Sequence, residues 1–294
     1  MLDRYEGGLL GLAIGDAVGT TVEFKQRGSF PPVTDMVGGG VFYLEPGQWT
    51  DDTSQALCIG QSLLEKDRMD LKDQMEKYWK WFNHGYMSST GDCFDIGTAT
   101  RKAIYKYVDS KFTQFLCGSG DPNTAGNGAL MRLVPVPLFY YNDLDKMIEN
   151  SKLSCLTTHG AMECLDACGY FASLIYEAME GKSKEEILNS KIYTPSTEKV
   201  KYIQDGYYKN KSQKKIKSDG YVINSLEAAL WSFYNTETFE EAILKVVNLG
   251  DDADTVGAIC GQLAGVYYGK SSIRQDWIDK LHSNRFISIL IIPV

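Results

Sequence analysis

An all-α protein with a single domain is the fold that this sequence of 294 residues predicts. Most segments carry apolar residues three and four positions apart, which is the spacing of an amphipathic helix. Alternation of apolar and polar residues, typical of a strand, is scarce. Loops rich in Gly, Pro, Asn and Asp separate the helical segments, as at 31–40 and 118–128. No long linker or low-complexity stretch interrupts the chain, so we expect one domain over residues 1–294.

The helical periodicity defines the expected elements in order along the chain. The strongest segments are 52–65, 71–82, 96–108, 162–180, 223–234, 239–247 and 255–268. Residues 41–44, Val-Phe-Tyr-Leu, are the only plausible short strand.

Two glycine ladders indicate helices at the centre of the bundle. Gly7, Gly11, Gly15 and Gly19 recur every fourth residue, and Gly257, Gly261, Gly265 and Gly269 do the same near the other end. Glycine in a helix costs about 1 kcal/mol relative to alanine, so eight such positions imply a structural need. Close approach of two buried backbones is the simplest one. Asp16 interrupts the first ladder, and neither stretch reaches the ~18 apolar residues of a membrane helix.

Composition restricts the classes of function. An apolar content of 44% and a charged content of 23% are ordinary for a folded soluble protein. The net charge of −8 would repel nucleic-acid phosphates, so we expect no direct nucleic-acid binding. A negative protein that handles an anionic substrate needs a cationic intermediary, and bound metal is the usual one.

The seven cysteines and the chain ends favour a cytoplasmic protein without a membrane anchor. The cysteines are scattered, odd in number and form no Cys-x-x-Cys pair, as expected of reduced thiols. The first residues lack the basic and apolar regions of a signal peptide. The apolar tail 286–294 is too short to span a bilayer, and we expect it to pack on the core or on a neighbouring subunit.

Two acidic clusters open helices and are the candidate metal ligands. Thr50-Asp51-Asp52 precedes the helix over 52–65, where N-capping explains the residues at least as well as metal does. The second cluster, 251–255, opens a glycine-ladder helix. Oxygen ligands of this kind suit magnesium or manganese, and carboxylates from two clusters could bridge two ions.

Other all-α metal enzymes fit less well. The Asp-Asp-x-x-Asp signature of isoprenoid synthases would need an aspartate where Gln55 stands. The histidine-aspartate phosphohydrolases need several metal-binding histidines, and this chain has three histidines in all.

Seven motifs follow one another along nearly the whole chain. They are Gly-Asp-Ala-Val-Gly-Thr-Thr-Val-Glu-Phe (15–24), Trp-Thr-Asp-Asp-Thr (49–53), Phe-Asp-Ile-Gly (94–97), Gly-Asn-Gly-Ala-Leu-Met-Arg (126–132), Thr-His-Gly (158–160), Gly-Tyr-Val-Ile-Asn-Ser-Leu-Glu-Ala-Ala-Leu-Trp (220–231) and Gly-Asp-Asp-Ala-Asp-Thr (250–255). In these motifs and in their order, the chain resembles the ADP-ribosylglycohydrolase family.

The resemblance implies a compact orthogonal helical bundle with two Mg²⁺ or Mn²⁺ ions. It implies as metal ligands Thr50, Asp51, Asp52, Asp252, Asp254 and Thr255, while Asp251 occupies a position more often filled by glycine. Glu23 matches an acidic residue beside the metals. The implied catalytic carboxylates are therefore Glu23, Asp51 and Asp52, with the choice between general acid and general base left open.

The remaining motifs indicate a substrate cradle. In Ala125-Gly126-Asn127-Gly128 the small residues let backbone approach a ligand, and a following helix start would offer free amides to a pyrophosphate. Asp95 could hold ribose hydroxyls or a guanidinium, or cap the helix after it. His159 could contact the nucleotide, and Arg132 is as readily a buried structural partner as a phosphate ligand.

The implied activity is hydrolysis of the bond between ADP-ribose and a protein side chain, with arginine favoured. The partners are then a mono-ADP-ribosylated protein as substrate and ADP-ribose as product. Two alternatives remain at this point, a metal-dependent phosphohydrolase and a non-catalytic relative that binds ADP-ribose or serves structurally. The lysine-rich segment 199–218 is either a solvated insertion or a docking surface for the modified protein.

Overall fold

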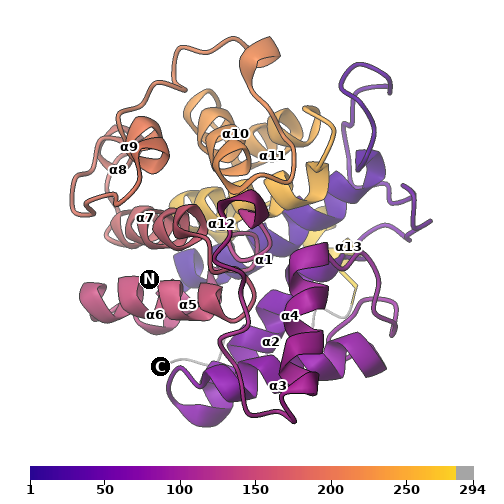
Figure 1. Ribbon diagram of the computed structural model, residues 1–294. Coiled ribbons are helices and arrows are strands. Elements are labelled where there is room, and N and C mark those ends of the chain that lie inside the picture. The colour runs from indigo at the N-terminus through magenta and orange to yellow at the C-terminus, as the bar shows by residue number, and fades with distance from the viewer. Residues whose placement is uncertain (283–294) are drawn as a thin grey trace.

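The computed structural model describes residues 1–282, and these residues form helices and loops without a β-sheet (Figure 1). The predicted packing of the tail 286–294 lies outside the described residues. The α-helices are α1 (Leu2–Gly19), α2 (Asp51–Lys66), α3 (Leu71–His84), α4 (Thr98–Asp109), α5 (Pro135–Phe139), α6 (Leu144–Leu156), α7 (Met162–Met179), α8 (Lys184–Leu188), α9 (Glu198–Gln204), α10 (Val222–Tyr234), α11 (Phe239–Val247), α12 (Ala253–Tyr268) and α13 (Gln275–Lys280).

The pair α1 and α12 forms the centre of the fold, and the glycine ladders explain why. A Cβ atom on Gly11 would lie 2.2 Å from the carbonyl oxygen of Gly261, and one on Gly261 would lie 1.9 Å from that of Gly11. Gly15 and Gly257 meet in the same way one turn further along. Because Gly11 meets Gly261 and the later Gly15 meets the earlier Gly257, the two helices run antiparallel. The predicted contact of the ladders is therefore confirmed.

The other helices cover this pair. The helices α10 and α11 pack on α12, and α2 contacts both α1 and α12 near the acidic residues (Figure 1). The helix α7 packs on α6 and α12, while α3 and α4 extend the bundle beyond α2. The prediction of an all-α fold is confirmed, and all seven predicted helices are present with ends within two residues.

Two local expectations are wrong. Residues 41–44 are not a strand, because the chain turns sharply through Gly38–Gly40, which all have positive φ, and only an isolated bridge joins Gly39 to Leu44. No helix follows Gly128 directly, since residues 129–132 form turns and α5 begins only at Pro135. The Gln262 side chain accepts from the Val134 amide at 2.7 Å and donates to the Met131 carbonyl at 2.7 Å. These two backbone groups therefore bond to a side chain and not to the backbone of a helical turn.

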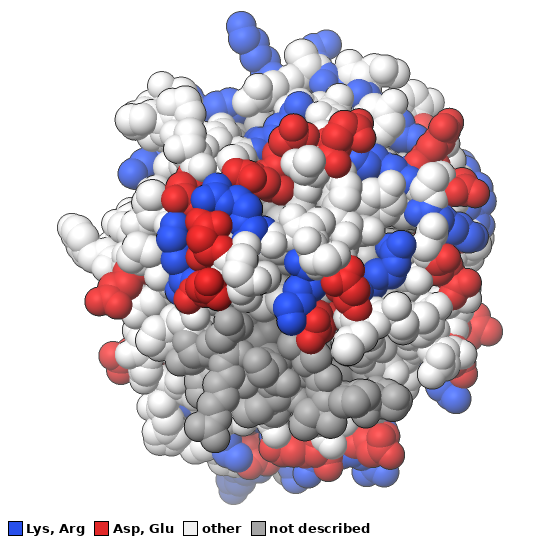
Figure 2. All heavy atoms as spheres, turned by 180° about the vertical axis from the view of Figure 1, so that it is seen from behind, with Lys and Arg blue, Asp and Glu red and all other residues white. Residues whose placement is uncertain are grey.

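The surface away from the viewer in Figure 1 carries interspersed acidic and basic side chains (Figure 2). Asp35, Glu240, Arg274, Asp276 and Lys280 form ion pairs with one another near the end of the described chain and its contacts. Among the described residues, none of the helices has the length and apolar character needed to cross a membrane.

Candidate active site

The acidic residues meet where α1 ends and where α2 and α12 begin. A Cβ atom on Gly19 would lie 2.4 Å from the Ala253 carbonyl oxygen, so the glycine ladder brings the start of α12 against the end of α1. Asp16 in the last turn of α1 accepts from Thr50 at the start of α2. Three helix termini that are far apart in sequence thus present carboxylates to one point.

Two groups of carboxylates lie close enough to share cations. Oxygen atoms of Asp16, Asp52 and Asp254 lie within 4.8 Å of one another, and so do those of Glu23, Asp252 and Asp254. Asp254 belongs to both groups. Thr50, also predicted as a ligand, places its Oγ1 3.0 Å from Asp52 Oδ2 and 3.2 Å from Asp254 Oδ2.

The electrostatics of the groups are those of a site built for a cation. Burial, then Asp95, raises the pKa of Glu23 to about 10. Burial, followed by the surrounding carboxylates, raises the pKa of Asp52 and of Asp254 well above the usual range. Bound cations would reverse these effects, because a positive ion favours the ionised carboxylate.

Unpaired buried oxygens point to the same conclusion. Glu23 Oε2, Asp52 Oδ1 and Asp254 Oδ1 are buried without a hydrogen-bond partner. A buried polar atom without a partner is costly in free energy, and each of these would be satisfied by coordination. The donor set is all oxygen, which fits a hard divalent cation.

The remaining predicted ligands lie at the edge of the two groups. Thr255 interacts with Asp252 and lines the pocket described below. Asp51 is 5% exposed and accepts from Gln55 at 2.5 Å. Asp251 has an exposed side chain outside both groups, and its carbonyl accepts from the Phe24 amide at 2.7 Å.

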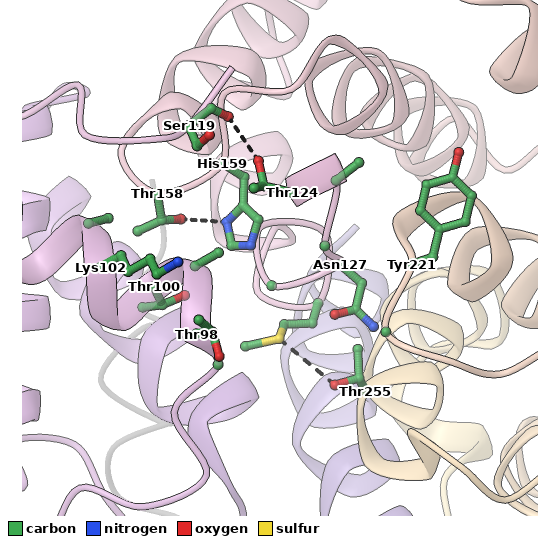
Figure 3. Close-up of a pocket in the computed structure, with 18 of the residues that line it drawn as sticks. Thr98, Thr100, Lys102, Ser119, Thr124, Asn127, Thr158, His159, Tyr221 and Thr255 are labelled. Atoms are coloured by element: carbon green, nitrogen blue, oxygen red, sulfur yellow. Dashed lines mark hydrogen bonds between the residues drawn. The ribbon is translucent and has the colours of Figure 1, made fainter. Parts of the chain in front are cut away.

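A pocket of about 1190 Å³ is lined in part by these carboxylates. Figure 3 shows other residues of its wall. Of the three predicted catalytic carboxylates, Glu23 and Asp51 line the pocket and Asp52 does not. All six predicted substrate residues, Asp95, Ala125, Gly126, Asn127, Gly128 and His159, line it as well.

The loop 125–128 is held by α10 and by the second acidic cluster. The Asn127 amide donates to the Gly220 carbonyl at 3.1 Å, and the Val222 amide donates to the Ala125 carbonyl at 3.0 Å. The Asn127 side chain donates to Asp252 Oδ2 at 2.7 Å. Asn127 therefore orients a candidate ligand carboxylate as well as lining the pocket.

A buried polar chain joins the first acidic cluster to His159. The Arg132 guanidinium donates to the Gln55 side chain, and Gln55 in turn donates to Asp51. Arg132 also donates to Thr158 Oγ1 at 2.6 Å. Its guanidinium lies over the Tyr78 ring at 4.5 Å. Arg132 therefore bonds to buried residues of the fold and does not line the pocket.

The same chain assigns the tautomer of His159. Thr158 Oγ1 accepts from Arg132, so its own proton goes to His159 Nδ1 at 2.7 Å. Burial, then the charge of Arg132, lowers the His159 pKa to about 3 and keeps the ring neutral. The proton therefore sits on Nε2, beside Gly126 and Gly128 in the pocket (Figure 3).

Asp95 faces the carboxylates and does not cap α4. The N-cap residue of α4 is Gly97, which has no capping side chain. Asp95 has a φ of +56° and interacts with Glu23 and Asp254. Burial raises its pKa to about 7.

The sequence analysis missed Asp16, Gln55 and the basic wall of the pocket. Lys102 and Lys106 on α4 and Lys199 on α9 all line the pocket. The spacing of Lys102 and Lys106 could have indicated the first two, because residues four positions apart lie on one face of a helix. Lys199 begins the lysine-rich segment 199–218 that the sequence analysis noted. Figure 3 shows the Lys102 side chain extending into the pocket toward His159.

The lysine-rich segment 199–218 borders the pocket and is partly held by ion pairs. Lys199 pairs with Glu163 at 2.9 Å, and Lys211 pairs with Glu227. Arg27 anchors the segment by donating to the Ile216 carbonyl at 2.6 Å. The side chains of Lys214, Lys215 and Lys217 are exposed.

Known proteins share this sequence and this fold. The family model described as ADP-ribosylglycohydrolase matches residues 1–291. The ADP-ribosylarginine hydrolase Tri1 of Serratia proteamaculans is 44% identical over 98% of this chain and 78% of its own length. The ADP-ribosyl-[dinitrogen reductase] glycohydrolase of Rhodospirillum rubrum is 31% identical over 95% of this chain and 90% of its own.

A solved structure, the ADP-ribosylglycohydrolase-related protein complex, has a TM-score of 0.85 at 40% identity and covers 99% of this chain and 96% of its own. Family profile, relatives and solved structure agree over nearly the full length. This chain belongs to the ADP-ribosylglycohydrolase family.

Proposed function

We propose that this protein hydrolyses the N-glycosidic bond between ADP-ribose and an arginine side chain of a modified protein. The observation that carries the proposal is the pair of carboxylate groups beneath a pocket large enough for a nucleotide. The names of two relatives that are 44% and 42% identical to this chain, both ADP-ribosylarginine hydrolase Tri1, support arginine as the acceptor.

The residues present fit two divalent cations, which we propose to be Mg²⁺ or Mn²⁺. Asp52, Asp254 and the Thr50 hydroxyl would hold the deeper ion, and Glu23, Asp252 and Asp254 the ion nearer the pocket. Asp51 and Thr255 would complete the ligand set. Bound there, the ions would supply positive charge that orients ribose hydroxyls and stabilises developing negative charge.

The reaction adds water across the bond between the ribose anomeric carbon and the guanidino nitrogen. The water oxygen ends on the anomeric carbon, and a water proton ends on the departing guanidino group. Glu23 and Asp51 are the two predicted catalytic carboxylates that line the pocket, and either can hold or move this proton. Neutral His159 donates from Nε2 to the bound nucleotide, and Asp95 faces the ribose side of the pocket.

The lysines that line the pocket, Lys102, Lys106 and Lys199, bind the anionic pyrophosphate of the substrate. Changing Lys102 to Met removes one cation from the pocket, and we expect the KM for ADP-ribosyl-arginine to rise about tenfold or more, since a hydrogen bond to a charged group contributes about 1.5–3 kcal/mol. The matched control is Arg101→Met on the same helix, because Arg101 does not line the pocket. Equal KM values for the two variants would contradict this placement.

We propose the exposed lysines Lys214, Lys215 and Lys217, which shortly precede the pocket residues Gly220 and Tyr221 in the chain, as a docking surface for the modified protein. Changing Lys214, Lys215 and Lys217 to Ser should raise the KM for a modified protein about tenfold at low salt, because positive charges accelerate encounter with a partner that carries opposite charge. The KM for ADP-ribosyl-arginine should not change. A control with Lys72, Lys80 and Lys146 changed to Ser removes the same charge elsewhere on the surface, where any ion-pair partner is exposed. If the two triple variants behave alike, the segment is only solvated.

The acceptor is tested with peptides that carry ADP-ribose on arginine or on serine. Incubation with and without Mg²⁺, followed by chromatography of released ADP-ribose, should show release from arginine only and only with the ion. Faster release from serine would overturn the assignment of the acceptor.

A further inference from the structure

Asp16 is a buried carboxylate in the last turn of α1 that the predicted ligand set does not include. Its side chain is fully buried. Its oxygens lie close to those of Asp52 and Asp254, as a metal ligand would require. The hydrogen bonds around it nevertheless give it a different role.

The carboxylate of Asp16 caps the N-terminus of α2 from another helix. The Thr50 amide donates to Asp16 Oδ1 at 2.9 Å, and the Thr53 amide donates to Oδ2 at 3.1 Å. An N-cap side chain normally accepts from the amide three residues on, but Thr50 makes no such bond. Asp16, 34 residues earlier, accepts it in place of the Thr50 hydroxyl.

Both threonine hydroxyls also donate to Asp16. Thr50 Oγ1 lies 3.0 Å from Oδ1, and Thr53 Oγ1 lies 2.6 Å from Oδ2. An ionised carboxylate has about four lone-pair sites, and four donor groups fill those of Asp16. With the Thr50 hydroxyl proton on Asp16, these four donors leave no lone pair of Asp16 for a cation.

The Thr50 hydroxyl has one proton and three carboxylate neighbours. When that proton points to Asp16, the lone pairs of Thr50 Oγ1 face Asp52 and Asp254, at 3.0 and 3.2 Å. Oxygen lone pairs so close together repel unless a cation or a carboxyl proton lies between them, and a bound cation would take the place of such protons. The Thr50 hydroxyl would then be a neutral metal ligand: its proton is held by Asp16, and its lone pairs face the space between Asp52 and Asp254.

We infer that Asp16 is a positioning residue that orients Thr50 and the start of α2 as a metal-binding surface, without itself binding the metal. The glycine ladder on either side of it supports this role. Gly15 and Gly19 bring α1 against α12, so Asp16 is held beside the second cluster while it bonds to the start of α2. This inference rests on the metal site of the proposed function.

The test measures Mn²⁺ binding to the full chain by titration calorimetry, independently of activity. Asp16→Asn keeps the shape but presents an amide N–H to the threonine donors, and we expect the Kd for Mn²⁺ to rise about 10–100-fold. Thr53→Val removes one donor to Asp16 without replacing any carboxylate of the two groups, and its Kd should rise by a smaller factor. Ser62→Ala is the control, a buried hydroxyl on α2 that contacts Asp73 instead.

The outcomes separate the possible roles of Asp16. If Asp16 were a ligand, Thr53→Val would free a lone pair and tighten Mn²⁺ binding, which would overturn the inference. Kd values within twofold of wild type for both variants would also overturn it. Circular dichroism checks that each variant folds, and Thr53→Val decides the matter if Asp16→Asn does not. A wild-type chain that binds no Mn²⁺ would overturn the metal site itself as well.

Discussion

Changing Asp254 to Asn is expected to lower the rate of ADP-ribose release about a thousand-fold while the helices stay intact. Asp254 belongs to both carboxylate groups, so its loss disturbs both candidate ion positions at once. Metal ions contribute several kcal/mol to transition-state stabilisation, and each 1.4 kcal/mol is a factor of ten in rate. The measurement is the initial rate with ADP-ribosyl-arginine at saturating Mg²⁺, with circular dichroism to confirm folding.

The matched control for this prediction is Asp251→Asn. Asp251 lies three residues earlier with an exposed side chain, and asparagine tolerates its φ of +55°. Its activity should stay within about twofold of wild type, since the site keeps all its carboxylates. Excess chelator should abolish wild-type activity, and Mg²⁺ or Mn²⁺ should restore it. Full wild-type activity in excess chelator would contradict the account. So would an Asp254→Asn variant that keeps more than a tenth of the wild-type rate.

Changing Gly261 to Leu is expected to give the largest loss of stability. Even the Cβ atom would lie 1.9 Å from the carbonyl oxygen of Gly11, where the neighbour is backbone and cannot move aside. Overpacking of a core costs about 1–3 kcal/mol or more, so the melting temperature should fall by about 5–10 °C or the chain should not fold. Gly11→Leu should behave similarly, because the two residues occupy the two sides of one contact.

Gly120→Ala is the control for the glycine contact. A Cβ atom there would meet only the Gly160 carbonyl oxygen, at 3.9 Å, which is ordinary van der Waals contact. Its melting temperature should be unchanged or slightly raised, since alanine restricts the unfolded chain. Thermal denaturation of Gly261→Leu that matched this control would refute the role of the ladder.

The elements that the sequence could predict are those with a local signal. The ladder from Gly7 to Gly19 predicted a close helix pair, because glycine at every fourth residue has few other uses in a buried helix. The clusters after Gly47 and Gly250 predicted candidate ligands, because several carboxylates at a helix start are unusual. The resemblance to the family then supplied the arginine preference, and the relatives agree with it.

The elements that the sequence could not predict depend on contacts between distant residues. Asp16 looked like an interruption of the ladder, since its partners Thr50 and Thr53 lie 34 and 37 residues away. The expected helix after Gly128 fails because Gln262, 128 residues beyond Val134, bonds the backbone groups there. Capping of α2 by Thr50, equally plausible from sequence, is replaced by capping from Asp16.

The central claim is that the protein breaks the glycosidic bond and leaves the pyrophosphate intact. Hydrolysis of an arginine-ADP-ribosylated peptide in H₂¹⁸O, followed by mass spectrometry of the products, tests it directly. The account predicts unmodified arginine peptide and intact ADP-ribose that carries ¹⁸O on its terminal ribose. Phosphate or a nucleoside monophosphate carrying ¹⁸O, with ribose still on the peptide, would show a phosphohydrolase and contradict it.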